Sequence, residues 1–158
     1  MTQSEVVGRV LGGDSTVTFD PAAIPQVVFS DPEVVSVGLT FDEATAEAGG
    51  TTDGPARRFR FPFSASARAR TLGCPEGFAE IVADTEGTVI GMHLVGAHVS
   101  ELAGEAALAV ELAATLDDVA ATIHPHPTMS EAVAEAAQGA LGHPLHVRAA
   151  RAGVRGSR

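Results

Sequence analysis

The chain has 158 residues, of which 45% are apolar, and this length and composition predict one globular domain that buries a core. Its formal net charge of −10 at pH 7 argues against a nucleic-acid-binding surface and against attraction to anionic membranes, and no apolar run is long enough to span a bilayer. The single cysteine excludes an internal disulfide framework and, with no signal-peptide pattern in residues 1–10, predicts a cytoplasmic protein.

The first part of the sequence predicts a helix followed by two strands. Residues 1–11, with Gly12-Gly13-Asp14 after them, are typical of the end of a helix and its stop signal. Two β-rich runs follow at residues 26–29 and 33–39, and a turn at Asp31-Pro32 separates them.

A capping box and an alternating strand come next. Thr40-Phe41-Asp42-Glu43 has the S/T-x-x-E form that opens a helix, and the helix is predicted to stop at Gly49-Gly50. Residues 57–63 alternate basic with aromatic side chains, which places three phenylalanines on one face: Phe59, Phe61 and Phe63. Such alternation can indicate single-stranded nucleic-acid binding, but a strand with one buried face and one solvated arginine face is the favoured interpretation.

The second half predicts a hairpin and three helical segments. Residues 78–84 and 88–96 form the hairpin, with a glycine in the joining Thr85-Glu86-Gly87 turn. The helical segments are residues 100–114, 116–121 and 132–141, the last ending at Gly142. Because the strands come in hairpin-type pairs rather than βαβ units, the predicted fold is α+β, an antiparallel sheet of about five strands with helices on one side.

The segment from His124 to Glu131, which reads HPHPTMSE, contains the candidate catalytic groups. Pro125 and Pro127 fix their own backbone angles and hold the preceding residues in extended conformations, so the imidazoles of His124 and His126 are aimed by a stiff backbone. Residues two apart on an extended segment point to the same side, so the two rings project together, or diverge if the His126-Pro127 bond is cis. The sequence leaves both arrangements open.

Glu131 has two alternative roles. Thr128-Met129-Ser130-Glu131 matches a capping box, in which Thr128 is the N-cap and Glu131 returns to the backbone N–H of that cap. Alternatively, its carboxylate accepts a hydrogen bond from His126, which fixes the ring tautomer and raises its basicity while the other ring nitrogen faces a substrate. The two roles compete for the same oxygens, and the sequence does not choose between them.

The remaining histidines and the cysteine are assigned structural roles. His93 and His98, together with the HPHP histidines, invite a metal-site interpretation, but zinc needs three or four ligands at compatible spacing and no metal site is predicted. His143 and His146 are interpreted as capping and packing residues. Cys74 is interpreted as structural or merely exposed.

Several motifs resemble those of one known family, in the same order. They are IPQVVFSDPEV at residues 24–34, VGLT at 37–40, FPFSA at 61–65, GMHLVG at 91–96, Glu101-Leu102, the HPHPTMSE segment, and GHPLH at 142–146. From about residue 24 to residue 147 the sequence is similar to the C-terminal dimerisation (interface) domain of pyridine-nucleotide disulfide oxidoreductases. Within that family it is most similar to the dihydrolipoamide dehydrogenase branch.

The resemblance implies roles for three residues. His126 matches the catalytic acid/base of the family, Glu131 matches its hydrogen-bonded partner, and His126 with Pro127 matches a backbone contact to the flavin of the partner subunit. In the family the histidine reaches across a twofold interface and shuttles a proton between the substrate dithiol and two redox cysteines, whose chemistry needs a thiolate. We therefore expect a homodimer through this domain, with lipoyl domains of 2-oxo acid dehydrogenase complexes as further candidate partners.

The chain also lacks parts that the family requires. Cys74 alone cannot form the redox disulfide, and no G-x-G-x-x-G fingerprint marks a dinucleotide-binding domain. We expect FAD and NAD in the complete enzyme, and no bound cofactor and no activity for this chain alone. Residues 1–22 are expected to be the tail of a missing preceding domain, residues 23–147 the dimerisation domain, and residues 148–158 a flexible arginine-containing tail.

Two alternatives remain beside this interpretation. One is a stand-alone dimerisation or partner-binding module without redox activity. The other is an independent metal-dependent or acid/base enzyme built on His126 and Glu131. The stand-alone module gives the histidine–glutamate pair no function, and the independent enzyme lacks a nucleophile or enough metal ligands.

Overall fold

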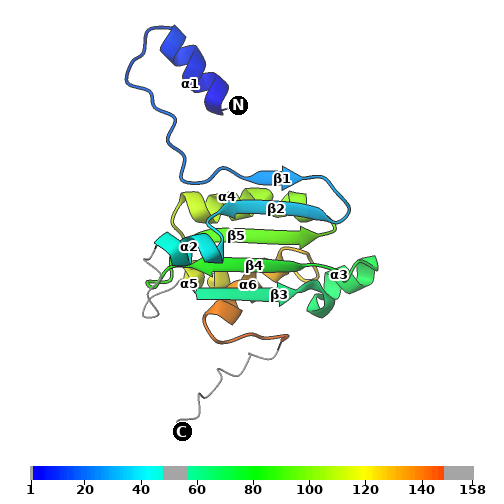
Figure 1. The fold of residues 1–158 in the computed structure, drawn as a ribbon. Coiled ribbons are helices and arrows are strands. Elements are labelled where there is room, and N and C mark those ends of the chain that lie inside the picture. The colour runs from blue at the N-terminus through cyan, green and yellow to red at the C-terminus, as the bar shows by residue number, and fades with distance from the viewer. Residues whose placement is uncertain (1, 48–56, 148–158) are drawn as a thin grey trace.

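The computed structural model describes residues 2–47 and 57–147, and these residues form an antiparallel sheet covered by helices (Figure 1). The sheet has five strands in the order β1-β2-β5-β4-β3, and every neighbouring pair is antiparallel. The strands are β1 (Gln26–Val28), β2 (Glu33–Gly38), β3 (Arg57–Pro62), β4 (Phe78–Ala83) and β5 (Val89–Gly96). The predicted α+β fold with about five antiparallel strands is confirmed.

The helices divide between the two faces of the sheet. In chain order they are α1 (Thr2–Leu11), α2 (Phe41–Glu47), α3 (Ala67–Leu72), α4 (Ala103–Glu111), α5 (Leu116–Ala121) and α6 (Glu131–Ala140), with short 3₁₀ turns η1 (Phe63–Ala65) and η2 (Val99–Leu102). Figure 1 shows α4, α5 and α6 on one face, the short α2 on the other, and α1 standing apart from the sheet. Helices α4, α5 and α6 therefore share one side of the sheet, as predicted, and α2 lies on the other.

The main core lies between the sheet and the helices α4, α5 and α6. Strand alternation directs Ile81 and Leu94 towards these helices, and both are fully buried. Phe61 and Phe63 are also buried in this core, as their shared face predicts. Because α6 packs against β3 and β4 and against α5, the loop between α5 and α6 joins two helices that pack together.

The other face of the sheet carries a charged cluster. Glu80 is buried, and its carboxylate forms ion pairs with Arg60 at 2.9 Å and with Arg58 at 3.9 Å. The same guanidinium groups lie over aromatic rings, Arg58 over Phe41 and Arg60 over Phe78. The arginines of β3 thus have partners within the fold, which agrees with the structural interpretation of the basic–aromatic alternation.

The helix boundaries agree with the sequence-based predictions at some ends and differ at others. At α2 the capping box forms as predicted, with Glu43 N–H donating to Thr40 Oγ1 at 3.2 Å and Thr40 N–H donating to Glu43 Oε2 at 2.9 Å. The predicted helix at residues 100–114 instead begins as the 3₁₀ turn η2 and ends at Glu111. Among the residues that the structure describes, no helix is long and apolar enough to cross a membrane.

Some predictions fall on residues outside the described ranges. The Gly49-Gly50 stop of α2 and the tail at residues 148–158 are among them. The division into residues 1–22, 23–147 and 148–158 therefore stays a prediction.

Candidate functional site

The HPHPTMSE segment forms the loop between α5 and α6, and its two histidines have different partners. His126 Nδ1 lies 2.8 Å from Glu131 Oε1, whereas His124 Nε2 lies 2.7 Å from Glu105 Oε1 on α4. The His126-Pro127 peptide bond is cis. Of the two arrangements that the sequence left open, the structure therefore shows divergent rings.

The contact between His126 and Glu131 determines which ring nitrogen carries hydrogen. A carboxylate only accepts hydrogen bonds, so His126 Nδ1 donates to Glu131 Oε1. In the neutral ring this leaves Nε2 without hydrogen and with a free lone pair. The side chain of His126 is 69% exposed, so the ring is accessible at the surface while one nitrogen is fixed. An accessible imidazole in a fixed tautomer is suited to accept a proton.

Glu131 performs both of the roles that the sequence had set against each other. Its Oε1 accepts from His126, and its Oε2 accepts from the backbone N–H of Thr128 at 2.8 Å. The competition expected for the same oxygens is absent because the carboxylate has two, and each has its own donor. Glu131 therefore orients the imidazole and tethers the loop backbone at the same time.

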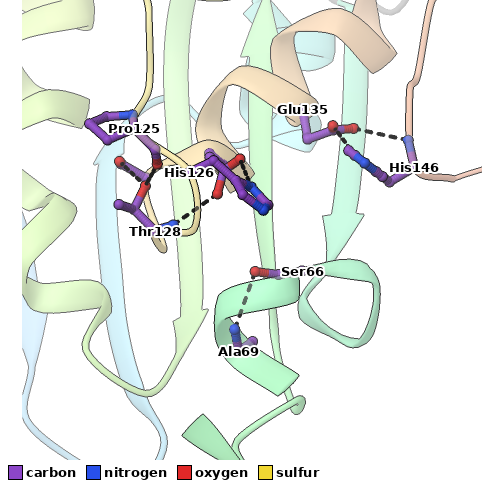
Figure 2. Close-up of polar contacts among 9 residues, drawn as sticks. Ser66, Ala69, Pro125, His126, Thr128, Glu135 and His146 are labelled. Atoms are coloured by element: carbon purple, nitrogen blue, oxygen red, sulfur yellow. Dashed lines mark hydrogen bonds and ion pairs between the residues drawn. The ribbon is translucent and has the colours of Figure 1, made fainter. Parts of the chain in front are cut away.

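The expected role of Thr128 as the N-cap is wrong. Helix α6 begins at Glu131 with Ser130 in the capping position, and no side chain caps it. Thr128 Oγ1 instead donates to the backbone oxygen of Pro125 at 2.7 Å, as Figure 2 shows. The hydroxyl therefore closes the HPHP turn on itself, and only the glutamate half of the capping box is present.

The environment of Glu131 favours its ionised form overall. Burial raises the pKa of Glu131, but the hydrogen bonds from the Thr128 N–H and from His126, with the nearby His126 and His146 charges, outweigh it and lower the pKa below its ordinary value. The carboxylate is therefore ionised wherever the imidazole would act as a base.

This shift predicts a pH-dependent contribution of Glu131 to stability. Because the folded-state pKa lies below the ordinary value of 4.5, the stabilisation is fully present above pH 4.5 and is lost as pH falls through the folded-state pKa. We expect Glu131→Gln to lower the melting temperature at neutral pH, and we expect this difference from the parent chain to narrow below pH 4.5. Thermal unfolding across pH measures it, with the exposed Glu86→Gln as control. A difference that widens on acidification would contradict the shift.

A second histidine–glutamate pair lies beside the first. His146 Nδ1 is 2.5 Å from Glu135 Oε1, and the His146 backbone N–H donates to Glu135 Oε2 at 3.3 Å (Figure 2). Both pairs line one small cavity of about 50 Å³ together with Phe61 and Ser66. This volume suits one or two water molecules and no cofactor. His146 was interpreted as a packing residue, and the structure shows that it ties the C-terminal segment to α6.

The other candidate ligands are dispersed. His93 bridges strands, with Nδ1 2.9 Å from Ser36 Oγ and Nε2 3.0 Å from the Leu39 carbonyl oxygen. Within residues 2–47 and 57–147, no three His, Cys, Asp or Glu side chains gather in a group that could hold a metal ion. Cys74 is half-buried next to α3, away from the HPHP loop in sequence.

Comparisons with known proteins agree in fold and sequence. The family model described as "Pyridine nucleotide-disulphide oxidoreductase, dimerisation domain" matches residues 24–137. The chain is 48% identical to a dihydrolipoyl dehydrogenase of Halobacterium salinarum over 145 residues, which cover 91% of this chain and 29% of the relative. It is 45% identical to the Pseudomonas aeruginosa dihydrolipoyl dehydrogenase over 148 residues, covering 93% and 31% of the two chains.

A solved structure gives the same result. The crystal structure of LpdA from Mycobacterium tuberculosis superposes with a TM-score of 0.72 at 28% identity, over 87% of this chain and 29% of that one. The chain therefore spans about three tenths of the length of each of these proteins. What is similar is one domain of a larger protein.

Proposed function

Because the chain belongs to the pyridine nucleotide-disulphide oxidoreductase dimerisation-domain family, we propose that it pairs with a second copy of itself. In this pair it acts as the dimerisation domain of a dihydrolipoyl-dehydrogenase-like disulfide oxidoreductase. It supplies His126 and Glu131 as an acid/base pair to the redox centre of the partner subunit. The main support is the exposed His126 ring with its Nδ1 fixed by Glu131. The described residues that line the cavity beside His126 include no cysteine, so a thiol for this base would come from outside that cavity.

The proposed chemistry is oxidation of a dihydrolipoyl dithiol to the disulfide. Attack on a redox disulfide requires a thiolate, so a base must first take a thiol proton. His126 Nε2 accepts that proton, and the resulting imidazolium is stabilised by the Glu131 carboxylate on the other side of the ring. The proton is later returned to a cysteine thiolate or lost to solvent as the centre turns over. The substrate class is proposed from the names of the relatives, and lipoyl domains are the corresponding proposed partners.

The cofactors are proposed to be FAD and NAD, held by other domains. The cavity behind His126 measures about 50 Å³, so the residues present fit an edge contact with a flavin and not an enclosed site. His126 and Pro127 on the loop are the proposed contact, as both residues are exposed. When bound, the flavin would carry the two electrons from the dithiol, through the redox disulfide, to NAD⁺.

The proposed dimer face lies on α4. Leu108 and Leu112 are 59% and 69% exposed, and with Gly104 and Ala107 they leave an apolar helix face beside a groove that the segment from Phe19 to Pro25 borders. A second copy is the proposed occupant because the matching family model is that of a dimerisation domain. Small side chains on this face would allow close approach of two helices.

A chimeric enzyme tests the proposed function. Residues 24–147 would replace the matching part of the Pseudomonas aeruginosa dihydrolipoyl dehydrogenase, with the parental enzyme as control. We expect a yellow FAD-containing dimer that oxidises dihydrolipoamide with NAD⁺, while the 158-residue chain alone binds no flavin and is inactive. A chimera that is dimeric and loaded with FAD but inactive would contradict the catalytic role and favour a dimerisation module. Turnover by the chain alone would contradict its dependence on other domains.

A further inference from the structure

His124 connects the HPHP loop to a distant helix. Its Nε2 lies 2.7 Å from Glu105 Oε1 on α4, and its Nδ1 lies 2.8 Å from the Thr122 carbonyl oxygen. The side chain is 7% exposed, in contrast to 69% for His126 two residues later. The first imidazole of the loop is therefore packed inside the fold, and the second lies at the surface.

Both ring nitrogens of His124 contact oxygen atoms of the fold. Nδ1 faces the Thr122 carbonyl oxygen and Nε2 faces the Glu105 carboxylate, and both of these groups accept hydrogen bonds. Because both nitrogens are engaged inside the fold, the role of this ring differs from that of His126.

The loop is thereby attached at two places to two different helices. At its start His124 binds α4 through Glu105. At its end the Thr128 backbone N–H donates to Glu131, the first residue of α6, and the Thr128 hydroxyl donates to the Pro125 carbonyl oxygen within the loop. His126 lies between these attachments, and its hydrogen bond with Glu131 forms only if the loop backbone holds the ring at hydrogen-bonding distance.

We propose that Glu105 and His124 are positioning residues, which anchor the HPHP loop to α4 and thereby hold His126 against Glu131. This inference rests on the proposed function of His126. Glu105 precedes the exposed Leu108 by one turn of α4, so the helix that presents the proposed dimer face also carries the anchor. The anchor does not touch substrate and acts only through the loop.

Two substitutions of one residue separate this role from general stability. In His124→Gln the side-chain amide takes the position of Nε2 and keeps a donor for Glu105, whereas in His124→Asn it takes the position of Nδ1 and reaches only Thr122. We expect His124→Gln to behave like the parent chain and His124→Asn to release the loop. His143→Gln, at an exposed histidine near the end of α6, is the matched control.

The first measurement uses the 158-residue chain and needs no catalysis. Nitrogen NMR of the imidazoles, at a pH above the usual histidine titration range, reports which nitrogen of His126 carries hydrogen. We expect hydrogen on Nδ1 in the parent and in His124→Gln, and a shift towards the tautomer mixture of a free histidine in His124→Asn. If His124→Asn does not fold, Glu105→Ala removes the other half of the anchor and carries the same test. An unchanged His126 tautomer in a folded anchor variant would overturn the proposal.

The second measurement uses the chimeric enzyme. We expect His124→Asn and Glu105→Ala to lower kcat roughly ten-fold with little change in KM, since a misplaced base costs rate more than binding. His124→Gln should stay within about two-fold of the parent, because its anchor is retained. If turnover depends on His126 but not on His124 or Glu105, only the positioning role fails. If turnover does not depend on His126, the proposed function itself fails.

Discussion

Replacing His126 by alanine in the chimeric enzyme should lower kcat by about 100-fold to 10,000-fold, the range that removal of a general acid/base produces. The expected cause is loss of the Nε2 lone pair that takes the thiol proton, while the side chain is 69% exposed and contributes little packing. Steady-state oxidation of dihydrolipoamide with NAD⁺ measures the effect. FAD content and dimer mass should be unchanged, which distinguishes lost chemistry from lost folding.

The matched control for this substitution is His143→Ala. His143 is also exposed and also lies at an end of α6, but it lines neither the cavity beside His126 nor the HPHP loop. Its replacement should leave turnover at the parental level. Parental turnover in His126→Ala itself would remove the catalytic role of the pair.

Replacing Leu108 by glutamate should dissociate the dimer. The substitution places a charge in the middle of the apolar α4 face, where pairing with a second copy would bury it without a partner, and buried unpaired charges are strongly unfavourable. We expect the dimer dissociation constant to rise by at least about 100-fold, measured by sedimentation velocity. Turnover should fall in parallel, because the proposed active site takes His126 from one subunit and the redox centre from the other.

A mixing experiment tests that shared site directly. One chimera carries His126→Ala, and the other lacks a redox cysteine in its Pseudomonas aeruginosa part. Each alone should be inactive, but random pairing of the two in a twofold dimer restores one complete site in half of the dimers, or about a quarter of parental activity. No recovery in a mixture shown to contain mixed dimers would contradict action across the interface. Thr85→Glu, which adds the same charge at an exposed position of the β4–β5 turn outside the groove beside α4, is the control for the interface substitution.

Much of the fold was accessible from the sequence because its signals are local. The β4–β5 hairpin follows from alternation around a glycine turn, and the Thr40–Glu43 capping box forms with the hydrogen bonds that its spacing predicts. Helix α3 was missed because its six residues, ARARTL, have no apolar stripe. Its signals are the Ser66 hydroxyl, which accepts from the Ala69 N–H, and Gly73 in a left-handed conformation.

In the candidate site, contacts between residues close in sequence could be predicted and contacts between distant residues could not. His126 and Glu131 are five residues apart, so a local motif was enough to place them together. Glu105 and His124 are 19 residues apart on different elements, and Glu135 and His146 are 11 apart around the end of α6. Pairing at such distances depends on how helices pack, which no spacing rule encodes. The dual role of Glu131 has another origin: its carboxylate has two oxygens, so a contact with the loop backbone and a contact with His126 do not exclude each other.

The bond between Glu135 and His146 has a practical consequence for handling the protein. Because His146 lines the cavity beside His126, the chain at residue 147 lies next to the proposed base. Figure 1 shows the opposite end of the described chain, at α1, beyond the far edge of the sheet past β1. An affinity tag, fluorophore or fusion partner attached after residue 147 would therefore compete with a partner subunit for the approach to His126, whereas one attached before α1 would leave that approach free.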